Sequence, residues 1–208
     1  STATGVQDRL HIAELYREAG HFNAAQVWIL SAYVRELPRG TTQGKEELWS
    51  HAWPRAFDAE VARATRRSKG RVDPNLVFAV MREESGYRPA VISPSGARGL
   101  LQIMEKTGTR LAADDGRAQP FDTELLFEPE TNLALGTLYL RELKVQFDGR
   151  LAPAIASYNA GPSAVQGWVE ASDPDEEEDE WVESIPYEQT RNYVKRVLRS
   201  MNAYQTIY

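Results

Sequence analysis

The spacing of hydrophobic and polar residues is helical along almost all of the 208-residue chain. Apolar residues recur every three or four positions, and glycine, proline and charged clusters separate the periodic segments. No alternating run of strand length interrupts this pattern. It predicts a mainly α-helical protein, with helices over 6–37 (a hairpin broken near Gly20), 45–50, 53–67, 73–85, 102–113, 122–128, 130–147, 151–158, 162–170 and 187–204.

The helix predicted over 73–85 carries the candidate chemistry. Asp73 suits the N-cap and Pro74 the first helical position, and an apolar run from Leu76 to Met81 follows. At about 100° per residue, with Leu76 at zero, Glu84 falls at about 80° within the apolar face, and Glu83 at about 340° on its flank. We therefore predict that Glu84 points toward the core and that Glu83 is a bystander.

Burial would give Glu84 a chemical use. Apolar surroundings disfavour the charged form of a carboxyl group and raise its pKa, as a general acid near neutral pH requires. The alternative is that Glu84 only ends a helix and reaches solvent or an arginine, although a negative charge there opposes the helix dipole.

Composition narrows the function classes. A net charge of −6 argues against nucleic acid as the main partner, since phosphate binding favours a basic surface. The absence of cysteine excludes a disulfide framework and a thiolate nucleophile. The scattered His11, His21 and His51 show no ligand spacing, so we expect no metal and no cofactor. We also expect no membrane-spanning segment, and nothing like a signal peptide opens the chain at Ser1.

Three separated motifs resemble those of the soluble lytic transglycosylases, goose-lysozyme-like enzymes that cleave peptidoglycan. The matching residues are Glu84-Ser85, Ser93 and Gly96-Ala97-Arg98-Gly99-Leu100-Leu101-Gln102-Ile103-Met104; Ser157-Tyr158-Asn159-Ala160-Gly161-Pro162; and Glu183-Ser184-Ile185-Pro186-Tyr187 with Thr190-Arg191 and Tyr193-Val194. The resemblance covers roughly residues 70–208.

This resemblance implies two parts. A lysozyme-like α-helical catalytic domain is expected over 69–208, preceded by a helical segment over 1–68. The spacing of small and large residues in 6–37 is close to that of a tetratricopeptide unit. That segment is either the end of a longer helical superhelix, which full-length members of the family often carry, or a plain two-helix appendage.

The resemblance also implies roles for individual residues. Glu84 would be the catalytic acid, and Tyr158 would hydrogen-bond Glu84 or the reacting sugar, unless it is only an aromatic residue at a helix end. The residues expected to line the cleft or contact glycan are Ser93, Gly99, Gln102, Met104, Asn159, Glu183 and Gln189. The structural alternatives are helix capping for Gln102, core packing for Met104 and an ordinary turn for Gly96 and Gly99.

Three further positions carry specific expectations. Glu183 would support a hydrogen-bond network or pair with Arg191, and we favour a structural role. Gln189 stands where the family commonly has glutamate, which leaves any charge-dependent role there in doubt. Gly136, inside a helix, indicates a close helix crossing, because glycine costs about 1 kcal/mol against alanine. The acidic run over 173–180 is predicted to be solvated, and it lacks the spaced ligands of a calcium loop.

The leading hypothesis is a peptidoglycan lytic transglycosylase that cleaves the MurNAc–GlcNAc β-1,4 bond and forms 1,6-anhydro-MurNAc, with Glu84 acting as acid and then as base. The alternatives are a hydrolytic muramidase that uses water, and a non-catalytic glycan-binding or scaffold protein. We expect a monomer in the periplasm or cell envelope whose partners are peptidoglycan glycan strands, with the N-terminal helices available to protein partners.

Overall fold

The structure is a computed structural model that describes residues 5–33, 37, 46–173 and 176–208. Within these ranges it is built from α-helices and one 3₁₀-helix: α1 (Val6–Glu18), α2 (Phe22–Tyr33), α3 (Glu46–Ala52), α4 (Asp58–Arg67), α5 (Pro74–Ser85), α6 (Glu105–Asp114), η2 (Thr123–Phe127), α7 (Pro129–Gln146), α8 (Leu151–Ala160), α9 (Pro162–Ala171), α10 (Glu178–Ser184) and α11 (Glu188–Ile207). The predicted mainly α-helical class is confirmed.

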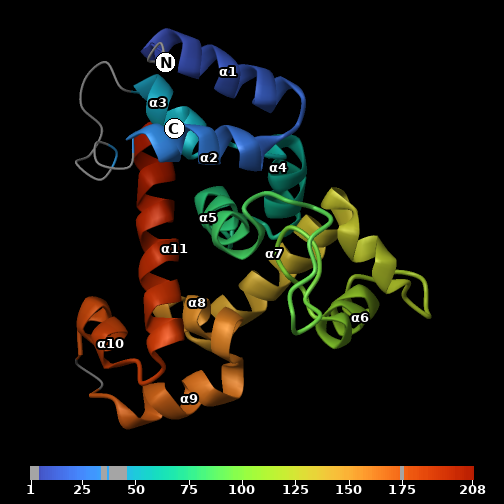
Figure 1. The fold of residues 1–208 in the computed structure, drawn as a ribbon. Helices are drawn as coiled ribbons and strands as arrows, with labels where there is room; N and C mark the ends of the chain where they lie inside the picture. Colours follow the sequence, from blue (N-terminus) through green and yellow to red (C-terminus); the bar gives the residue numbers. More distant parts are fainter. Residues whose placement is uncertain (1–4, 34–36, 38–45, 174–175) are drawn as a thin grey trace.

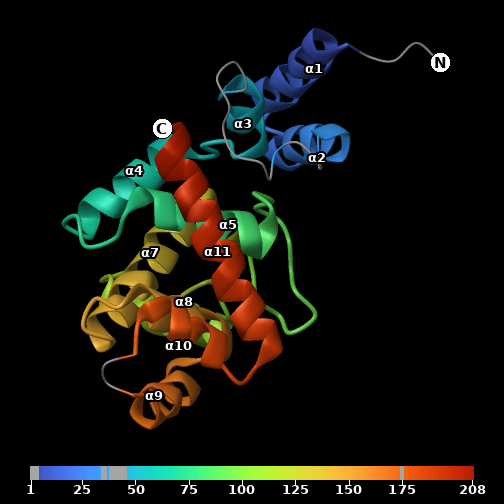
Figure 2. The ribbon, with the colours of Figure 1, turned by 90° about the vertical axis from the view of Figure 1, so that its left-hand side faces the viewer.

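The long helix α11 connects the two ends of the molecule (Figure 1). Its C-terminal end lies beside α3, and its N-terminal end reaches α9 and α10. Helices α1, α2 and α3 pack together above the remaining helices, which Figure 2 shows from the side. Helix α11 packs along α5 and also contacts α8. It thereby brings residues near 84, 158 and 193 into one neighbourhood.

Helix α5 is the centre of the core. Its residues from Leu76 to Met81 are all at most 1% exposed, so the helix has no solvent-facing side over these turns. A helix that is apolar all round is covered all round. The angular argument, which assumed one buried face, therefore underestimated how much of α5 is enclosed.

Most predicted helices form close to their expected bounds, and two differences have physical causes. Helix α4 begins at Asp58 because Phe57 has a left-handed backbone, with a φ of 57°, and cannot continue a helix from Trp53. Helix α6 begins at Glu105 with Met104 as its N-cap, so Gln102 lies in the preceding turn and does not cap a helix. The predicted loop over 39–44 lies outside the described residues.

Helix α10 was not predicted, because it begins within the acidic run. Three acidic residues occupy its first turn, where the positive end of the helix dipole stabilises their negative charges. Trp181, 1% exposed, and Val182 anchor the helix in the core. The Glu178 carboxylate accepts a hydrogen bond from the Ala152 N–H at 2.6 Å, at the start of α8. Residues 178–180 are exposed, as predicted for a solvated run, but they form the start of a helix, which was not predicted.

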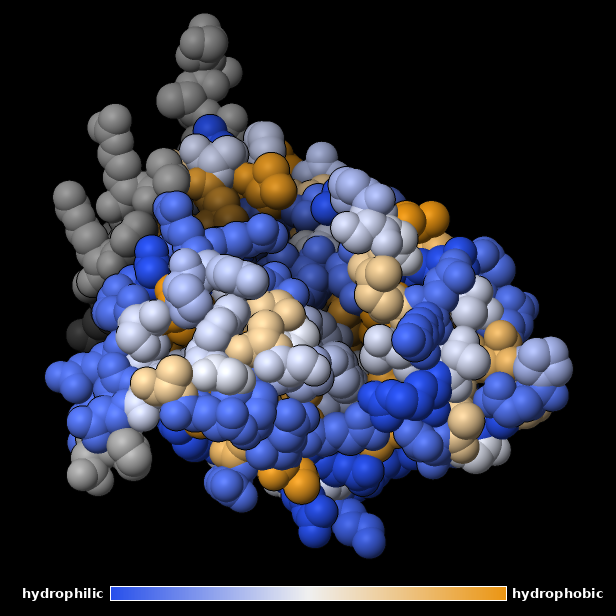
Figure 3. Space-filling model, turned by 90° about the horizontal axis from the view of Figure 1, so that it is seen from below, coloured by the Kyte–Doolittle hydropathy of each residue, from blue (hydrophilic) through white to orange (hydrophobic). Residues whose placement is uncertain are grey.

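Among the described residues, no helix combines the length and the apolar character that crossing a membrane needs. Seen from below, the surface is mainly polar, and hydrophobic residues show within a hollow near the middle of this face (Figure 3).

Candidate active site

Helix α5 places Glu84 through well-formed ends. The Asp73 side chain accepts the Asn75 N–H at 2.8 Å, and Pro74 opens the first turn. Gly86 ends the helix with a left-handed backbone, a φ of 56° and an N–H bonded to the Arg82 carbonyl. Glu84 thus lies in the last turn, immediately before the chain turns into the loop that follows.

Tyr193 holds the Glu84 side chain from α11. Its hydroxyl donates to Glu84 Oε1 at 2.5 Å. Burial raises the pKa of Glu84 to about 7, and the nearby Glu83 carboxylate acts in the same direction. The Tyr193 hydrogen bond and the Arg196 charge lower the pKa, but by less than burial raises it. The predicted raised pKa of Glu84 is confirmed, with the predicted cause.

Tyr158 reaches the same neighbourhood without bonding Glu84. Its hydroxyl donates to the Leu101 carbonyl at 2.7 Å, and its ring packs on Tyr139 with centroids 5.3 Å apart. The expected Tyr158–Glu84 hydrogen bond is therefore wrong, because the loop carbonyl lies within reach of the hydroxyl and takes it. A contact between Tyr158 and sugar stays a prediction.

Glu83 is not a surface bystander. Its side chain is 8% exposed and lies against Arg82 at 3.3 Å and Arg196 at 3.1 Å. The Ser200 hydroxyl donates at 2.9 Å to Oε1, the carboxylate oxygen that Arg82 also contacts. The earlier interpretation placed it on a flank of α5, but α11 covers that flank.

The loop between α5 and α6 is a compact folded segment. Arg98 forms antiparallel bridges to Ile92 and Ile103, which fold the loop back on itself. The Ser93 hydroxyl accepts the Ala97 N–H at 3.0 Å. Gln102, at a φ of 48°, donates its amide N–H groups to the Gly99 carbonyl at 2.8 Å and the Val91 carbonyl at 3.2 Å. These two predicted cleft residues therefore shape the loop from within.

The glycines of this region are explained by the protein's own packing. A Cβ at Gly99 would lie 2.1 Å from the Leu126 carbonyl and 2.3 Å from Asn132 Nδ2. A Cβ at Gly136 would lie 2.3 Å from Leu101. The close approach at Gly136 is thus to the loop, and the expected helix crossing is wrong.

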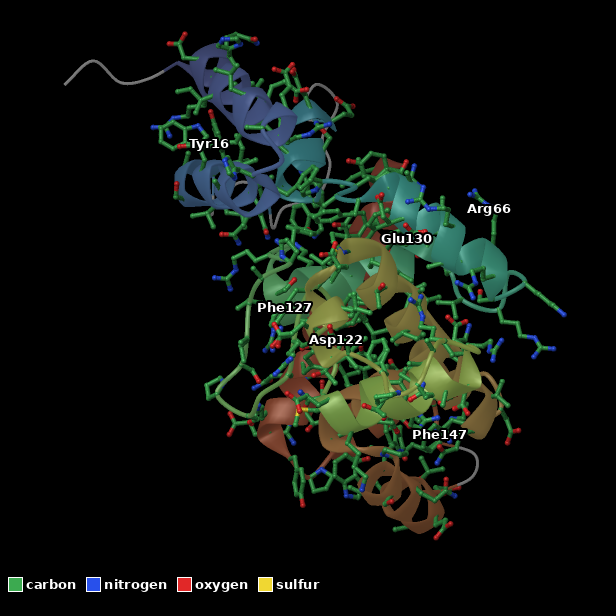
Figure 4. All side chains as sticks on the ribbon, turned by 90° about the vertical axis from the view of Figure 1, so that its right-hand side faces the viewer. Tyr16, Arg66, Asp122, Phe127, Glu130 and Phe147 are labelled. Atoms are coloured by element: carbon green, nitrogen blue, oxygen red, sulfur yellow. The ribbon has the colours of Figure 1, made fainter. Side chains whose placement is uncertain are left out.

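Asn132 fastens this loop to α7. Its side-chain oxygen accepts the Leu101 N–H at 2.8 Å, and its amide donates to the carbonyls of Arg98 at 3.0 Å and Leu126 at 2.7 Å. The side chain is fully buried, so these bonds satisfy groups that water cannot reach. Arg98 also lies over the Phe127 ring, 5.5 Å from its centroid, and Phe127 is labelled in Figure 4.

The remaining predicted site residues lie at the surface. Met104 is 44% exposed at the start of α6. Asn159 accepts a hydrogen bond from the Thr190 hydroxyl at 2.8 Å. Glu183 is 67% exposed and pairs with Lys195 at 2.7 Å. Arg191 instead donates to the Ile185 carbonyl, so the expected Glu183–Arg191 pair is wrong. Gln189 is exposed at the start of α11. Their roles toward glycan stay predictions.

A separate cavity of about 420 Å³ lies between α4 and α7. Arg66 and Glu130, two of the residues that line it, are labelled in Figure 4. Its lining includes several ion-paired side chains and none of the predicted site residues. Groups of three or more histidine, aspartate or glutamate side chains suited to a metal ion do not occur among the described residues.

Sequence reasoning missed Tyr193 as a site residue. It lies in the helix predicted over 187–204, where its side chain is only 4% exposed. Its position in the third motif was the available signal, because hydroxyl-bearing aromatics inside a core usually bind a partner. The partner itself, 109 residues earlier, could come only from the tertiary structure.

The mainly α fold, with one buried glutamate of raised pKa at a helix end, is that of a lysozyme-like protein. A family model described as Transglycosylase SLT domain matches residues 63–181. The chain belongs to this family.

Similar proteins agree with this membership. The soluble lytic murein transglycosylase of Salmonella typhimurium is 38% identical over 173 residues, which are 82% of this chain and 26% of that protein. The crystal structure of the 70 kDa soluble lytic transglycosylase from Escherichia coli superposes with a TM-score of 0.80 and 27% identity, over 99% of this chain and 31% of that one.

A third similar structure is that of an inactive glutamate-to-glutamine mutant of the lytic transglycosylase Slt from Pseudomonas aeruginosa. It has a TM-score of 0.77 and 27% identity, over 96% of this chain and 30% of that one. The chain thus spans about a quarter to a third of the length of the proteins it matches. The expected fold class is confirmed.

Proposed function

We propose that this protein is a lytic transglycosylase that cleaves the β-1,4 bond between MurNAc and GlcNAc in peptidoglycan. The observation that carries the proposal is the raised pKa of the Glu84 carboxyl group. With a pKa of about 7, this carboxyl is about half protonated at neutral pH, so its protonated form is available to give a proton to a glycosidic oxygen. Membership of the transglycosylase SLT domain family supplies the reaction class.

The adjacent carboxylate is not available as a second catalytic group. Most glycosidases use two carboxylates, one as acid and one as nucleophile or base. Glu83 is already bound by Arg82, Arg196 and Ser200. Because these three residues hold the Glu83 carboxylate, we favour a route in which the substrate supplies the nucleophile.

The proposed reaction uses Glu84 twice. Its protonated carboxyl gives a proton to the leaving oxygen as the bond to C1 of MurNAc breaks, and the 2-acetamido oxygen stabilises the positive charge at C1. The Glu84 carboxylate then takes the proton of the C6 hydroxyl, whose oxygen bonds to C1 and closes a 1,6-anhydro ring. Glu84 ends protonated, as it began, and no water is consumed.

The surrounding residues take supporting roles in this proposal. Tyr193 holds Glu84 Oε1 in place through its hydrogen bond. Tyr158 is the candidate contact to the reacting sugar. The positions predicted from the motifs would contact glycan: the half-buried Ser93 and Gln102, and the exposed Met104, Asn159, Glu183 and Gln189. The substrate places the protein in the cell envelope, and the N-terminal helices are the candidate surface for protein partners.

Mass spectrometry of digested peptidoglycan tests the proposal. The wild type is expected to leave 1,6-anhydro-MurNAc ends, and Glu84→Gln is expected to leave the substrate intact. Glu170→Gln is the matched control, because it makes the same change at an exposed glutamate that accepts a hydrogen bond from Gln166 and is not a predicted site residue. Reducing ends would indicate a hydrolytic muramidase. Binding with no cleavage by the wild type would indicate a glycan-binding protein, and equal cleavage by Glu84→Gln would refute the role of Glu84.

A further inference from the structure

Two consecutive glutamates of α5 are both bound by α11. Glu84 accepts from Tyr193, whereas Glu83 pairs with Arg196 and accepts from Ser200. Residues 193, 196 and 200 are spaced by three and four positions, so they lie on one face of the helix. One face of α11 therefore holds both carboxylates at the end of α5.

The side chains that form ion pairs with Glu83 differ in their exposure to solvent. Glu83 and Arg82 are enclosed, with side chains 8% and 12% exposed, whereas Arg196 is 46% exposed. Arg82, which pairs with Glu83, also packs on Trp53. Its guanidinium lies 4.9 Å from the centroid of the Trp53 ring. The ion pair between Glu83 and Arg196 thus joins an enclosed carboxylate to a half-exposed cation on the opposite helix.

Few charged or titratable groups act on Glu84. From α5 there is Glu83, from α11 there are Tyr193 and Arg196, and from α8 there is Tyr158. Tyr139 of α7 lies behind Tyr158. The phenols stay neutral near pH 7 because burial raises the pKa of both Tyr158 and Tyr193. Glu83 and Arg196 are therefore the two charges that bear on Glu84.

We propose that Glu83 and Arg196 are positioning residues for Glu84. Their ion pair holds α11 against the end of α5, which keeps Tyr193 on Glu84, and their opposite charges balance one another beside the acid. The catalytic consequence rests on the proposed function, whereas the electrostatic consequence does not.

The two charges have opposite signs, so their removal has opposite effects. The Glu83 carboxylate raises the pKa of Glu84, and the Arg196 guanidinium lowers it. Glu83→Gln keeps the size and hydrogen-bonding capacity of the side chain but leaves Arg196 unbalanced, so it lowers the pKa of Glu84. Arg196→Gln removes the balancing cation, so it raises the pKa. Loss of packing alone would move both variants in the same direction.

The test is an NMR titration of protein labelled with ¹³C at the glutamate carboxyl groups, in which the Glu84 signal is assigned by its loss in Glu84→Gln. We expect the midpoint to fall by roughly half a pH unit or more in Glu83→Gln and to rise in Arg196→Gln, with the smaller shift for the half-exposed arginine. The double variant is expected to titrate between the two single variants, because the two shifts have opposite signs.

Two control variants separate charge from packing. Lys195→Gln removes a cation from the neighbouring position of α11, where it pairs with Glu183, and is expected to leave the Glu84 midpoint unchanged. Ser200→Ala removes a hydrogen bond to Glu83 and no charge, so it is also expected to keep the midpoint. Arg196→Gln alters a half-exposed side chain and carries the test by itself if Glu83→Gln does not fold.

Equal midpoints in all variants, or shifts of Glu83→Gln and Arg196→Gln in the same direction, would overturn the proposal. Digests of peptidoglycan provide the catalytic readout, in which the alkaline limb of the pH profile is expected to follow the NMR midpoint. Absence of 1,6-anhydro products would count against the proposed function only, because the titration needs no substrate.

Discussion

The Tyr193 hydroxyl lies 2.5 Å from Glu84 Oε1, although the two residues are 109 positions apart. The contact joins the end of α5 to the first half of α11, two helices that pack side by side (Figure 2). It orients the carboxyl and offsets part of the effect of burial on its pKa.

Tyr193→Phe is expected to slow peptidoglycan cleavage and to move its pH dependence. The variant loses a hydrogen bond to a carboxyl group, which corresponds to a decrease in kcat of about 10- to 100-fold. The same hydrogen bond lowers the pKa of Glu84, so its loss moves the alkaline limb to higher pH. Tyr158→Phe is the comparison, because its hydroxyl bonds Leu101 and not Glu84. An alkaline limb that moves equally in both variants would contradict the assignment.

Activity of the wild type is expected to decline as the pH rises through about 7, because the proposed acid must be protonated and the pKa of Glu84 is about 7. The measurement is kcat/KM for a soluble glycan fragment between pH 4 and 9. A profile that stays flat up to pH 9 would mean that Glu84 does not limit the reaction as an acid.

Glu84→Gln is expected to stabilise the protein at alkaline pH. The pKa of Glu84 is about 7 when folded, against 4.5 for an ordinary glutamate, so the folded state keeps a proton that the unfolded state releases. Wild-type stability therefore falls between these two pH values, and glutamine removes this dependence. The expected gain is about 1 to 3 kcal/mol above pH 7 and near zero below pH 4.

Urea denaturation of both proteins at pH 4 and pH 8 measures this difference. Glu170→Gln again serves as the control, since an exposed glutamate should show no such gain. A Glu84→Gln variant that is less stable than the wild type at pH 8 would show that the carboxylate is favoured in the folded protein.

Gly99→Ala is expected to be far more destabilising than Gly96→Ala. A Cβ at Gly99 would meet the Leu126 carbonyl at 2.1 Å, and this backbone atom cannot move aside easily. Gly96 has a similar backbone, with φ values of 87° and 76° for the two glycines, but nothing lies within 4 Å of its Cβ position. We expect a loss of about 1 kcal/mol at Gly96, from backbone strain, and more than about 3 kcal/mol at Gly99.

Thermal or urea unfolding of the two variants measures the difference, and the shared positive φ makes each the control of the other. Similar losses would indicate that the loop shifts away from Leu126 and Asn132 and is less rigidly held than the structure shows.

The sequence alone determined the helical class, most helix positions and the inward direction of Glu84. These properties depend on local signals: the period of apolar residues, the Asp73-Pro74 start of α5 and the Gly86 end. The same local reasoning missed α10, because the acidic run does not have a helical hydrophobic pattern. The stability of this helix comes from Trp181 and Val182, which lie in the core. It also extended α4 back to Trp53, since the left-handed backbone of Phe57 leaves no mark in the hydrophobic pattern.

The partners of the acid were decided only by the tertiary structure. Helical angles correctly placed Glu84 inward, but they ranked Glu83 as a bystander because they assume one covered face. Helix α11 covers the flank of α5 that carries Glu83, so this side chain is only 8% exposed and must be paired. In the same way, Tyr158 and Tyr193 were both only aromatic residues of the matched motifs in the sequence. Only the packing of α8 and α11 directed one hydroxyl to Leu101 and the other to Glu84.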